Sequence, residues 1–263
     1  MSVLASFLFG LIIGSFLNVL ILRRSVSSLG GRSHCMSCGT QIAWYDNVPV
    51  VSWLLLDGRC RHCKSAISAQ YPLVELLTAI LFALLGGAPL SYAELFIGFS
   101  IIALAIAITV YDLRHTIIPD EWVYPFAILA ISFAYLWSGL MAGPVLFVLA
   151  GPLIAAPLFL LWLVSGGRWM GLGDAKLALG MGWLLGPLYG FYALSFGFIL
   201  GAVIALCVLL PLPHIARALS GIVRLSRGGM RFTMKSEVPF GPFLIVATLC
   251  IWFLLLYRIP LPL

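Results

Sequence analysis

Long runs of apolar residues alternate with short polar breaks along most of the chain. The runs lie near residues 3–22, 72–88, 93–111, 122–138, 143–164, 176–190, 191–211 and 239–257. Crossing the hydrocarbon core of a bilayer takes about 20 apolar residues in a helix, so each run predicts a membrane-spanning helix. The pattern therefore predicts an all-α polytopic membrane protein with about eight transmembrane helices.

The runs at 176–190 and 191–211 are the least regular of the eight. Glycines and a Gly-Pro step interrupt them, so one bent or re-entrant element could replace two crossings. Gly182, Gly186 and Gly190 recur every four residues, a spacing that lets helix backbones approach closely. We therefore expect helix packing at these glycines.

A single polar stretch near the N-terminus divides the chain. We expect a first transmembrane helix at residues 1–22, a small cytoplasmic loop domain at 23–71 and a membrane-embedded core at 72–263. The first run has no basic residue before it and no small-residue cleavage site. We therefore expect it to remain as a span and not to be removed as a signal peptide.

Composition and charge fit this arrangement. Hydrophobic residues make up 62% of the chain and charged residues 9%, and the mean hydropathy is +1.12, which excludes a soluble domain. Eight crossings place fourteen of the fifteen lysines and arginines in alternate loops, which are cytoplasmic by the positive-inside rule; Arg258 is the exception. The net charge of +6 then lies beside anionic lipid, so the expected partner is the bilayer and not nucleic acid.

The polar loop holds two Cys-x-x-Cys pairs, separated by residues 39–59. Four thiolates in two knuckles suit a tetrahedral zinc ion, and four cysteines leave no open ligand position, so we expect structural zinc. Two disulfides are the alternative, but thiols stay reduced in the cytoplasm. A redox pair is a further alternative, and the adjoining His34 and His62 could replace a ligand. The predicted zinc ligands are Cys35, Cys38, Cys60 and Cys63.

Four acidic residues lie within or at the edges of predicted spans: Glu75, Glu94, Asp112 and Asp174. A carboxylate at bilayer depth costs roughly 2.5–3.5 kcal/mol, so it normally faces the protein interior and has a function. Contact with water at the outer edge explains Glu94. Asp112 ends one run and Asp174 begins another, so both fall at cytoplasmic helix ends and could meet.

Two carboxylates brought together can share one proton, so that one activates water while the other protonates a carbonyl oxygen. This arrangement predicts acid–base proteolysis. Helix capping would also explain Asp174, although the helix dipole disfavours Asp112 at a C-terminal end. Ion-pathway carboxylates are a further possibility. The residues alone leave these interpretations open.

The chain resembles the bacterial type IV prepilin peptidases, a family of Gly-x-Gly-Asp intramembrane aspartyl proteases that also act as N-methyltransferases. The resemblance covers nearly the whole length. It rests on GSFLNVLILR at 14–23, the two cysteine knuckles, DNVPVVSWL at 46–54, GRCRHCKSAISAQYPLVELLTA at 58–79, DLRHTIIPD at 112–120, MGLGDAKL at 170–177 and PFGPFL at 239–244.

The resemblance implies that Asp112 and Asp174 are catalytic, that the four cysteines bind zinc and that the protein lies in the bacterial inner membrane. The implied substrates are prepilins and pseudopilins, whose short basic leader is cut after a glycine at the cytoplasmic face. The new N-terminal residue, usually phenylalanine, would then be methylated from S-adenosylmethionine.

Methyl transfer is the second of the two implied activities. The chain has no strand followed by a glycine-rich turn of the usual nucleotide-binding kind. Family proteins often carry a glutamate before Asn-x-Pro, where this chain has Asp46 followed by Asn47, and we expect these two residues to serve methyl transfer. The alternatives are a leader peptidase without methyltransferase activity, a carboxylate-based transporter and a membrane scaffold.

Overall fold

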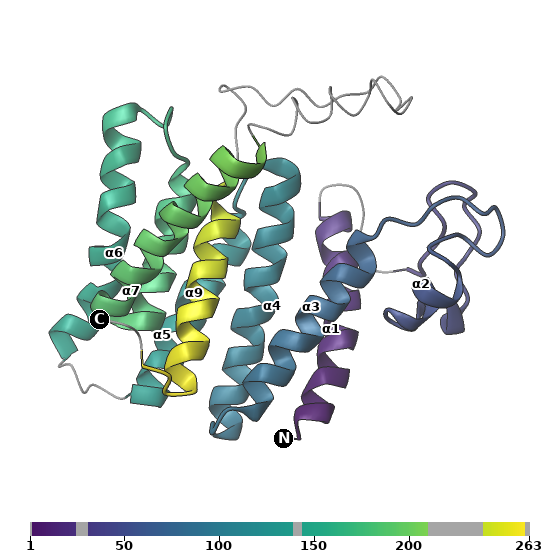
Figure 1. Ribbon diagram of the computed structural model, residues 1–263, viewed down its shortest axis with the longest axis horizontal. Coiled ribbons are helices and arrows are strands. Elements are labelled where there is room, and N and C mark those ends of the chain that lie inside the picture. The colour runs from purple at the N-terminus through teal and green to yellow at the C-terminus, as the bar shows by residue number, and fades with distance from the viewer. Residues whose placement is uncertain (1, 25–30, 139–143, 210–238, 261–263) are drawn as a thin grey trace. The chain divides into compact units, whose positions relative to one another are not determined.

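The computed structural model of the chain describes residues 2–24, 31–138, 144–209 and 239–260 (Figure 1). These residues form helices and contain no strand, only two isolated bridges. The all-α prediction is confirmed. The elements are α1 (Val3–Arg23), η1 (Trp44–Asn47), α2 (Val51–Leu55), α3 (Gln70–Gly87), α4 (Tyr92–His115), α5 (Asp120–Ser138), α6 (Pro144–Ser165), α7 (Leu172–Ile204), η2 (Ala205–Leu209) and α9 (Gly241–Leu256).

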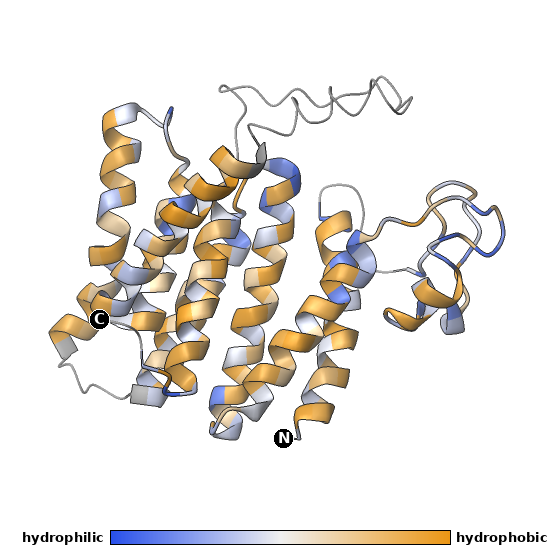
Figure 2. Cartoon of the chain, in the orientation of Figure 1, coloured by the Kyte–Doolittle hydropathy of each residue, from blue (hydrophilic) through white to orange (hydrophobic). Residues whose placement is uncertain are grey.

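The long helices have the length and composition of membrane spans. Five stretches among the described residues are long and apolar enough to cross a bilayer: Val3–Arg23, Gln70–Gly87, Tyr92–His115, Val145–Ser165 and Leu172–Cys207. Figure 2 shows that these helices are hydrophobic along most of their length. A polytopic membrane protein is therefore confirmed, and α5 and α9 cover two further predicted spans.

The chain forms two compact units, and the first comprises Met1–Val110 and Leu255–Leu263. Within it, α1 packs closely on α3 because glycines replace side chains at the contact. A Cβ atom on Gly10 would lie 2.6 Å from the Cα of Ala79, and one on Gly14 would lie 2.6 Å from the Cα of Glu75. Small residues four apart let two helix backbones touch in this way.

The second unit, Tyr111–Leu254, contains residues 111–115 of α4 together with α5, α6, α7 and α9. Its longest helix, α7, is not straight. Gly186 has φ 77° and ψ 176°, a conformation that L side chains rarely adopt, and Pro187 follows it. A Cβ atom on Gly190 would lie 3.4 Å from the Cα of Gly182, so the chain folds back at Gly186 and its two arms touch.

The fold-back explains how 33 residues fit one membrane. A straight helix of that length would measure about 50 Å, against about 30 Å of hydrocarbon core. The two arms of α7 match the predicted spans at 176–190 and 191–211, but the break lies at Gly186 and not at residue 190. The expected glycine packing is confirmed at Gly182, where a Cβ atom would lie 2.9 Å from the Cα of Gly151 in α6.

Part of the predicted topology cannot be compared with the structure. The seventh loop, which follows the second arm of α7, lies outside the described residues. Its basic residues are Arg217, Arg224, Arg227, Arg231 and Lys235.

Candidate functional site

Two of the predicted acidic residues lie at the same end of the second unit. Asp112 belongs to the last turn of α4, and Asp174 belongs to the first turn of α7. Both are buried, with exposed fractions of 4% and 8%. Their carboxylates are close enough to interact electrostatically. Folding therefore brings together two acids that are distant in sequence.

A glycine lies beside each of these carboxylates. A Cβ atom on Gly241, the first residue of α9, would lie 2.7 Å from Oδ2 of Asp112. One on Gly171, just before α7, would lie 3.7 Å from Oδ2 of Asp174. Oδ2 of Asp112 is buried and has no hydrogen-bond partner among the described residues. Such an oxygen is rare in folded proteins.

Ile118, in the connection between α4 and α5, packs beside this site. A Cβ atom on Gly173 would lie 2.9 Å from the Cβ of Ile118, and a Cβ atom on Gly241 would lie 3.1 Å from its Cδ1. The connection thus lies against the N-termini of both α7 and α9. Both glycines of the Gly-x-Gly-Asp sequence lie where a side chain would meet a neighbour. At Gly173 the neighbour is Ile118, and at Gly171 it is the carboxylate of Asp174.

Lys176 forms an ion pair at the same end of the unit. Its Nζ lies 2.7 Å and 2.9 Å from the two carboxylate oxygens of Asp120, the first residue of α5. Nζ also lies 5.4 Å from the ring centroid of Tyr124. These contacts join the first turns of α5 and α7 and account for the lysine without a chemical role.

In the first unit, the four predicted cysteines form one cluster. Their Sγ atoms all lie within 4.8 Å of one another, and those of Cys35 and Cys63 are 3.7 Å apart. A tetrahedral zinc ion with Zn–S distances of about 2.3 Å would hold sulfurs about 3.8 Å apart. The cluster fits zinc, and His34 and His62 do not belong to it. All six cysteines of the chain are free thiols, so the disulfide alternative is wrong.

The two knuckles repeat the same backbone geometry. The N–H of Cys35 donates to the carbonyl of Thr40, and the N–H of Cys60 donates to that of Ser65, both at 2.9 Å. Hydrogen bonds from the backbone of Cys38 and Ser37, and from the Ser65 hydroxyl, lower the pKa of Cys35 to about 5. This sulfur is therefore a thiolate at neutral pH, the form that binds metal.

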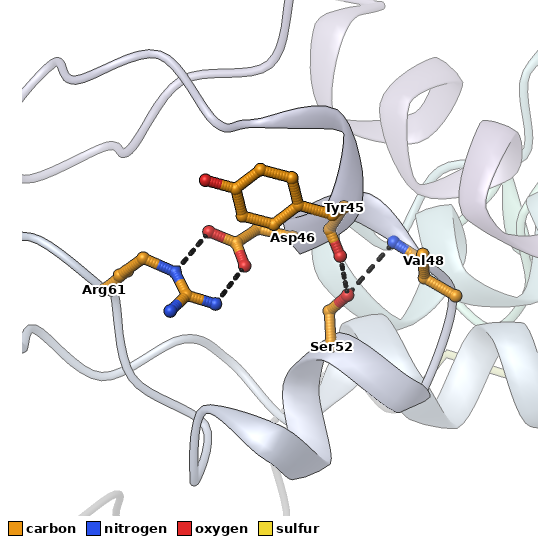
Figure 3. Close-up of polar contacts among 5 residues, drawn as sticks. All are labelled: Tyr45, Asp46, Val48, Ser52 and Arg61. Carbon is orange, nitrogen blue, oxygen red and sulfur yellow. Dashed lines mark hydrogen bonds and ion pairs between the residues drawn. The ribbon is translucent and has the colours of Figure 1, made fainter.

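Asp46 is tied to the second knuckle (Figure 3). Arg61 donates to its carboxylate twice, from Nε at 2.8 Å and from Nη2 at 2.6 Å, and the guanidinium lies 5.6 Å from the Tyr45 ring centroid. The Arg61 guanidinium holds the pKa of Asp46 below its usual value. Each oxygen of the Asp46 carboxylate accepts a hydrogen bond from Arg61, and only 10% of the Asp46 side chain is exposed. The neighbouring Asn47 is exposed.

Sequence reasoning left Glu75 without a role, and the structure gives it a partner. Glu75 is buried in α3, and its Oε2 accepts a 2.7 Å hydrogen bond from the N–H of Val50. Val50 has φ 62° and ψ −50°, and the N–H of Val51 donates to the carbonyl of Pro49 at 2.6 Å. This is a γ-turn with positive φ at its centre, a strained conformation for a β-branched residue.

Comparisons with known proteins match two parts of the chain. A family model described as the Bacterial Peptidase A24 N-terminal domain matches residues 8–87, which include the four cysteines. A second, described as the Type IV leader peptidase family, matches residues 99–206, which include Asp112 and Asp174.

Three curated proteins illustrate the similarity. The prepilin leader peptidase/N-methyltransferase of Aeromonas salmonicida (strain A449) is 31% identical over 92% of this chain and 87% of its own length. The type 4 prepilin-like proteins leader peptide-processing enzyme of Escherichia coli O78:H11 (strain H10407 / ETEC) is 36% identical over 68% of this chain and 75% of its own. The prepilin leader peptidase/N-methyltransferase of Myxococcus xanthus (strain DK1622) is 42% identical over 49% of this chain and 39% of its own length. No solved structure matches the chain.

Proposed function

The chain belongs to the type IV leader peptidase family, and on this basis we propose which of its residues perform which step. It is a membrane-embedded enzyme that removes the leader of prepilins and methylates the new N-terminus. Asp112 and Asp174 are the catalytic residues of the peptidase step. The observation that carries this assignment is the convergence of two buried, interacting carboxylates at helix ends, with Gly171 and Gly241 beside them.

The peptidase step uses the two acids as a pair that shares one proton. The charged carboxylate takes a proton from a water molecule, whose oxygen attacks the carbonyl carbon of the scissile peptide bond. The protonated partner gives its proton to the carbonyl oxygen. The tetrahedral intermediate then collapses, the C–N bond breaks, and the proton held by the first acid passes to the leaving amine.

Access to the peptide bond requires the substrate to be extended beside the acids. The backbone at Gly171 is exposed and lies beside Asp174, which suits a substrate strand lying against it. The unpartnered Oδ2 of Asp112 is then free to hydrogen-bond to the substrate or to the attacking water.

The methylation step uses S-adenosylmethionine as a second substrate. The neutral N-terminal amine of the cleaved pilin attacks the methyl carbon, so the N–C bond forms as the S–CH3 bond breaks. S-adenosylhomocysteine leaves as a neutral thioether, and the methylated ammonium loses a proton to water. We assign Asn47 to this step as a direct contact. Asp46 has an indirect role in this step: its carboxylate is hydrogen-bonded to Arg61, and this ion pair holds η1 in place.

Cys35, Cys38, Cys60 and Cys63 would hold one zinc ion. A zinc ion bound by four thiolates has no position for water, so it supplies cross-linking of the two knuckles and no Lewis-acid chemistry. We place the loop at 23–71 and the catalytic end of the core at 72–263 on the cytoplasmic side, because the basic residues of the predicted loops collect there.

One measurement separates this function from its alternatives. A type IV prepilin is produced with and without the full-length protein, and the mass of the pilin N-terminus is determined. We expect loss of the leader and the added mass of one methyl group. A leader peptidase without methyltransferase activity would remove the leader only. Retention of the leader would reject the proposal.

A further inference from the structure

The short helix α2 turns an apolar face away from the loop that carries it. Val51, Leu54 and Leu55 lie at positions i, i+3 and i+4, so they share one face, and they are 48%, 61% and 80% exposed. The other two residues of α2 face the loop. Ser52 is buried, and Trp53 Nε1 donates to a loop carbonyl at 3.2 Å. The apolar face of α2 therefore has no cover within the described part of the first unit.

Two aromatic side chains of η1 are exposed as well. Trp44 is 83% exposed and Tyr45 52% exposed, and their rings meet edge to face with centroids 5.7 Å apart. The Ser52 hydroxyl ties η1 to α2, because it donates to the carbonyl of Tyr45 at 2.9 Å and accepts from the N–H of Val48 at 3.1 Å (Figure 3). Tryptophan and tyrosine favour the boundary between hydrocarbon and water, since an apolar ring carries a polar group.

A hydrogen bond from Val50, the residue before α2, fixes the depth of α2 along α3. Its N–H donates to Oε2 of Glu75 at 2.7 Å. Glu75 lies five residues after Gln70, the first residue of α3, which is about 7.5 Å along the helix axis. With 18 residues, α3 measures about 27 Å and only just crosses a hydrocarbon core of about 30 Å, so its first turn lies at the membrane surface. Val50 is therefore held below that surface.

A contact with α1 places the start of α3 at the same depth. Asn18 is buried in α1, five residues before that helix ends at Arg23, and its Nδ2 donates to the carbonyl of Tyr71 at 3.1 Å. The first turn of α3 thus lies beside the membrane-spanning part of α1 and not beyond its end. The start of α2, joined to α3 one turn further on, lies at the depth of about 5–10 Å at which interfacial helices bury an apolar face.

The charge of the loop suits a membrane surface. Residues 23–71 contain six basic residues against two acidic ones, Asp46 and Asp57. A zinc ion held by four thiolates would add two negative charges and still leave the loop positive. Anionic headgroups attract basic residues near the surface. The basic residues are Arg23, Arg24, Arg32, Arg59, Arg61 and Lys64.

We propose that α2 docks on the lipid bilayer. Val51, Leu54 and Leu55 insert into the leaflet at which α1 ends and α3 begins, and Trp44 lies at the level of the headgroups. The zinc loop is then a peripheral membrane module and not a domain surrounded by water. Glu75 sets the depth of this module through Val50. The proposal concerns the first unit alone and depends on neither enzymatic activity.

The test is lipid photocrosslinking of the wild-type, full-length protein. The protein is reconstituted in vesicles of phosphatidylethanolamine and phosphatidylglycerol that contain a phospholipid with a diazirine in its acyl chain. Tandem mass spectrometry assigns the adducts to residues after illumination. Met36, in the first knuckle, is the matched reference, because it is 81% exposed but lies among polar residues in the sequence. Burial of one leucine favours the apolar side about tenfold or more, so we expect at least about tenfold more adducts on Leu54 and Leu55 than on Met36.

Phe96, which is 74% exposed in the span α4, is the positive control. Adducts on Phe96 with none on α2, or an equal yield on α2 and Met36, would overturn the proposal. A double variant, Leu54→Ser with Leu55→Ser, tests the cause. Its α2 adducts should fall at least about tenfold while those on Phe96 and the metal content stay unchanged. Wild-type adduct yield on α2 in this variant would also overturn the proposal, because the two leucines would not be what holds α2 in the lipid.

Discussion

The backbone of Gly241 lies so close to Asp112 that a methyl group on the glycine would be 2.7 Å from the unpartnered Oδ2. A Cβ atom does not tolerate that separation from an oxygen without a shift. The contact joins the end of α4 to the start of α9, and it fixes one face of the proposed catalytic pair.

Gly241→Ala should therefore displace Asp112 and slow leader cleavage on the order of 100-fold, the loss that a misplacement of about 1 Å brings. Cleavage rate on a purified prepilin is the measurement. Gly197→Ala is the control, since its Cβ would lie 3.1 Å from Cδ2 of Leu244 and neither acid is among its nearest neighbours. Wild-type cleavage by Gly241→Ala would mean that the site tolerates a side chain there.

Lys176→Gln should lower the cleavage rate less than about fivefold. Its partner Asp120 has 55% of its side chain exposed, and exposed ion pairs contribute about 0–1 kcal/mol. Asp120→Asn should have a similar effect, and the double variant should be no worse than either single one, because all three lose the same interaction. A Lys176→Gln protein as inactive as Asp174→Asn would place the ammonium in the chemistry.

Removal of one zinc ligand should release the metal. We expect one zinc ion per wild-type chain and far less in Cys38→Ala, with a lower unfolding temperature, since structural zinc contributes directly to folding. Methylation should fall more than cleavage, because Asn47, which we assign to methyl transfer, lies in the same loop. Cys250→Ala is the control, as Cys250 lies in α9 outside the cluster. Full metal content in Cys38→Ala would contradict the ligand set.

Asp46→Asn should destabilise the loop by the same amount throughout pH 5–8. Arg61 depresses the pKa of Asp46 in the folded protein, so the carboxylate stabilises the fold above its ordinary pKa of about 4. That stabilisation is lost only when the pH falls through the depressed value, below this window. Thermal unfolding of the two proteins across the window measures the difference. A difference that disappears between pH 5 and pH 8 would mean that another group titrates.

The hydrophobic pattern predicts the helices well because a span must be apolar over nearly its whole length. The break in α7 was misplaced by four residues, although its signal was present. Gly186 supplies the positive φ, and Pro187 is suited to the first turn of a new helix. The spacing of glycines alone did not distinguish the one that turns the chain from the two that pack.

Contacts between distant residues could not be read from the sequence. The cysteine knuckles were recognisable because metal coordination demands particular residues at a particular spacing. No comparable rule links Asp46 to Arg61, Glu75 to Val50 or Gly241 to Asp112, because each pair is joined only by the tertiary fold. These contacts show that Asp46 and Glu75 stabilise the loop, whereas Asp112, which lies beside Gly241, is proposed to be catalytic.

The most direct test of the catalytic pair is the cleavage of a prepilin by Asp112→Asn and Asp174→Asn, each compared with Glu94→Gln. Glu94 is an acid in a helical span too, but it forms a reciprocal cap with Ser91 that glutamine can keep. We expect each aspartate variant to insert, fold and bind zinc while losing about 10²–10⁴-fold or more in cleavage rate, and Glu94→Gln to cleave normally. Wild-type cleavage by either aspartate variant would contradict the account.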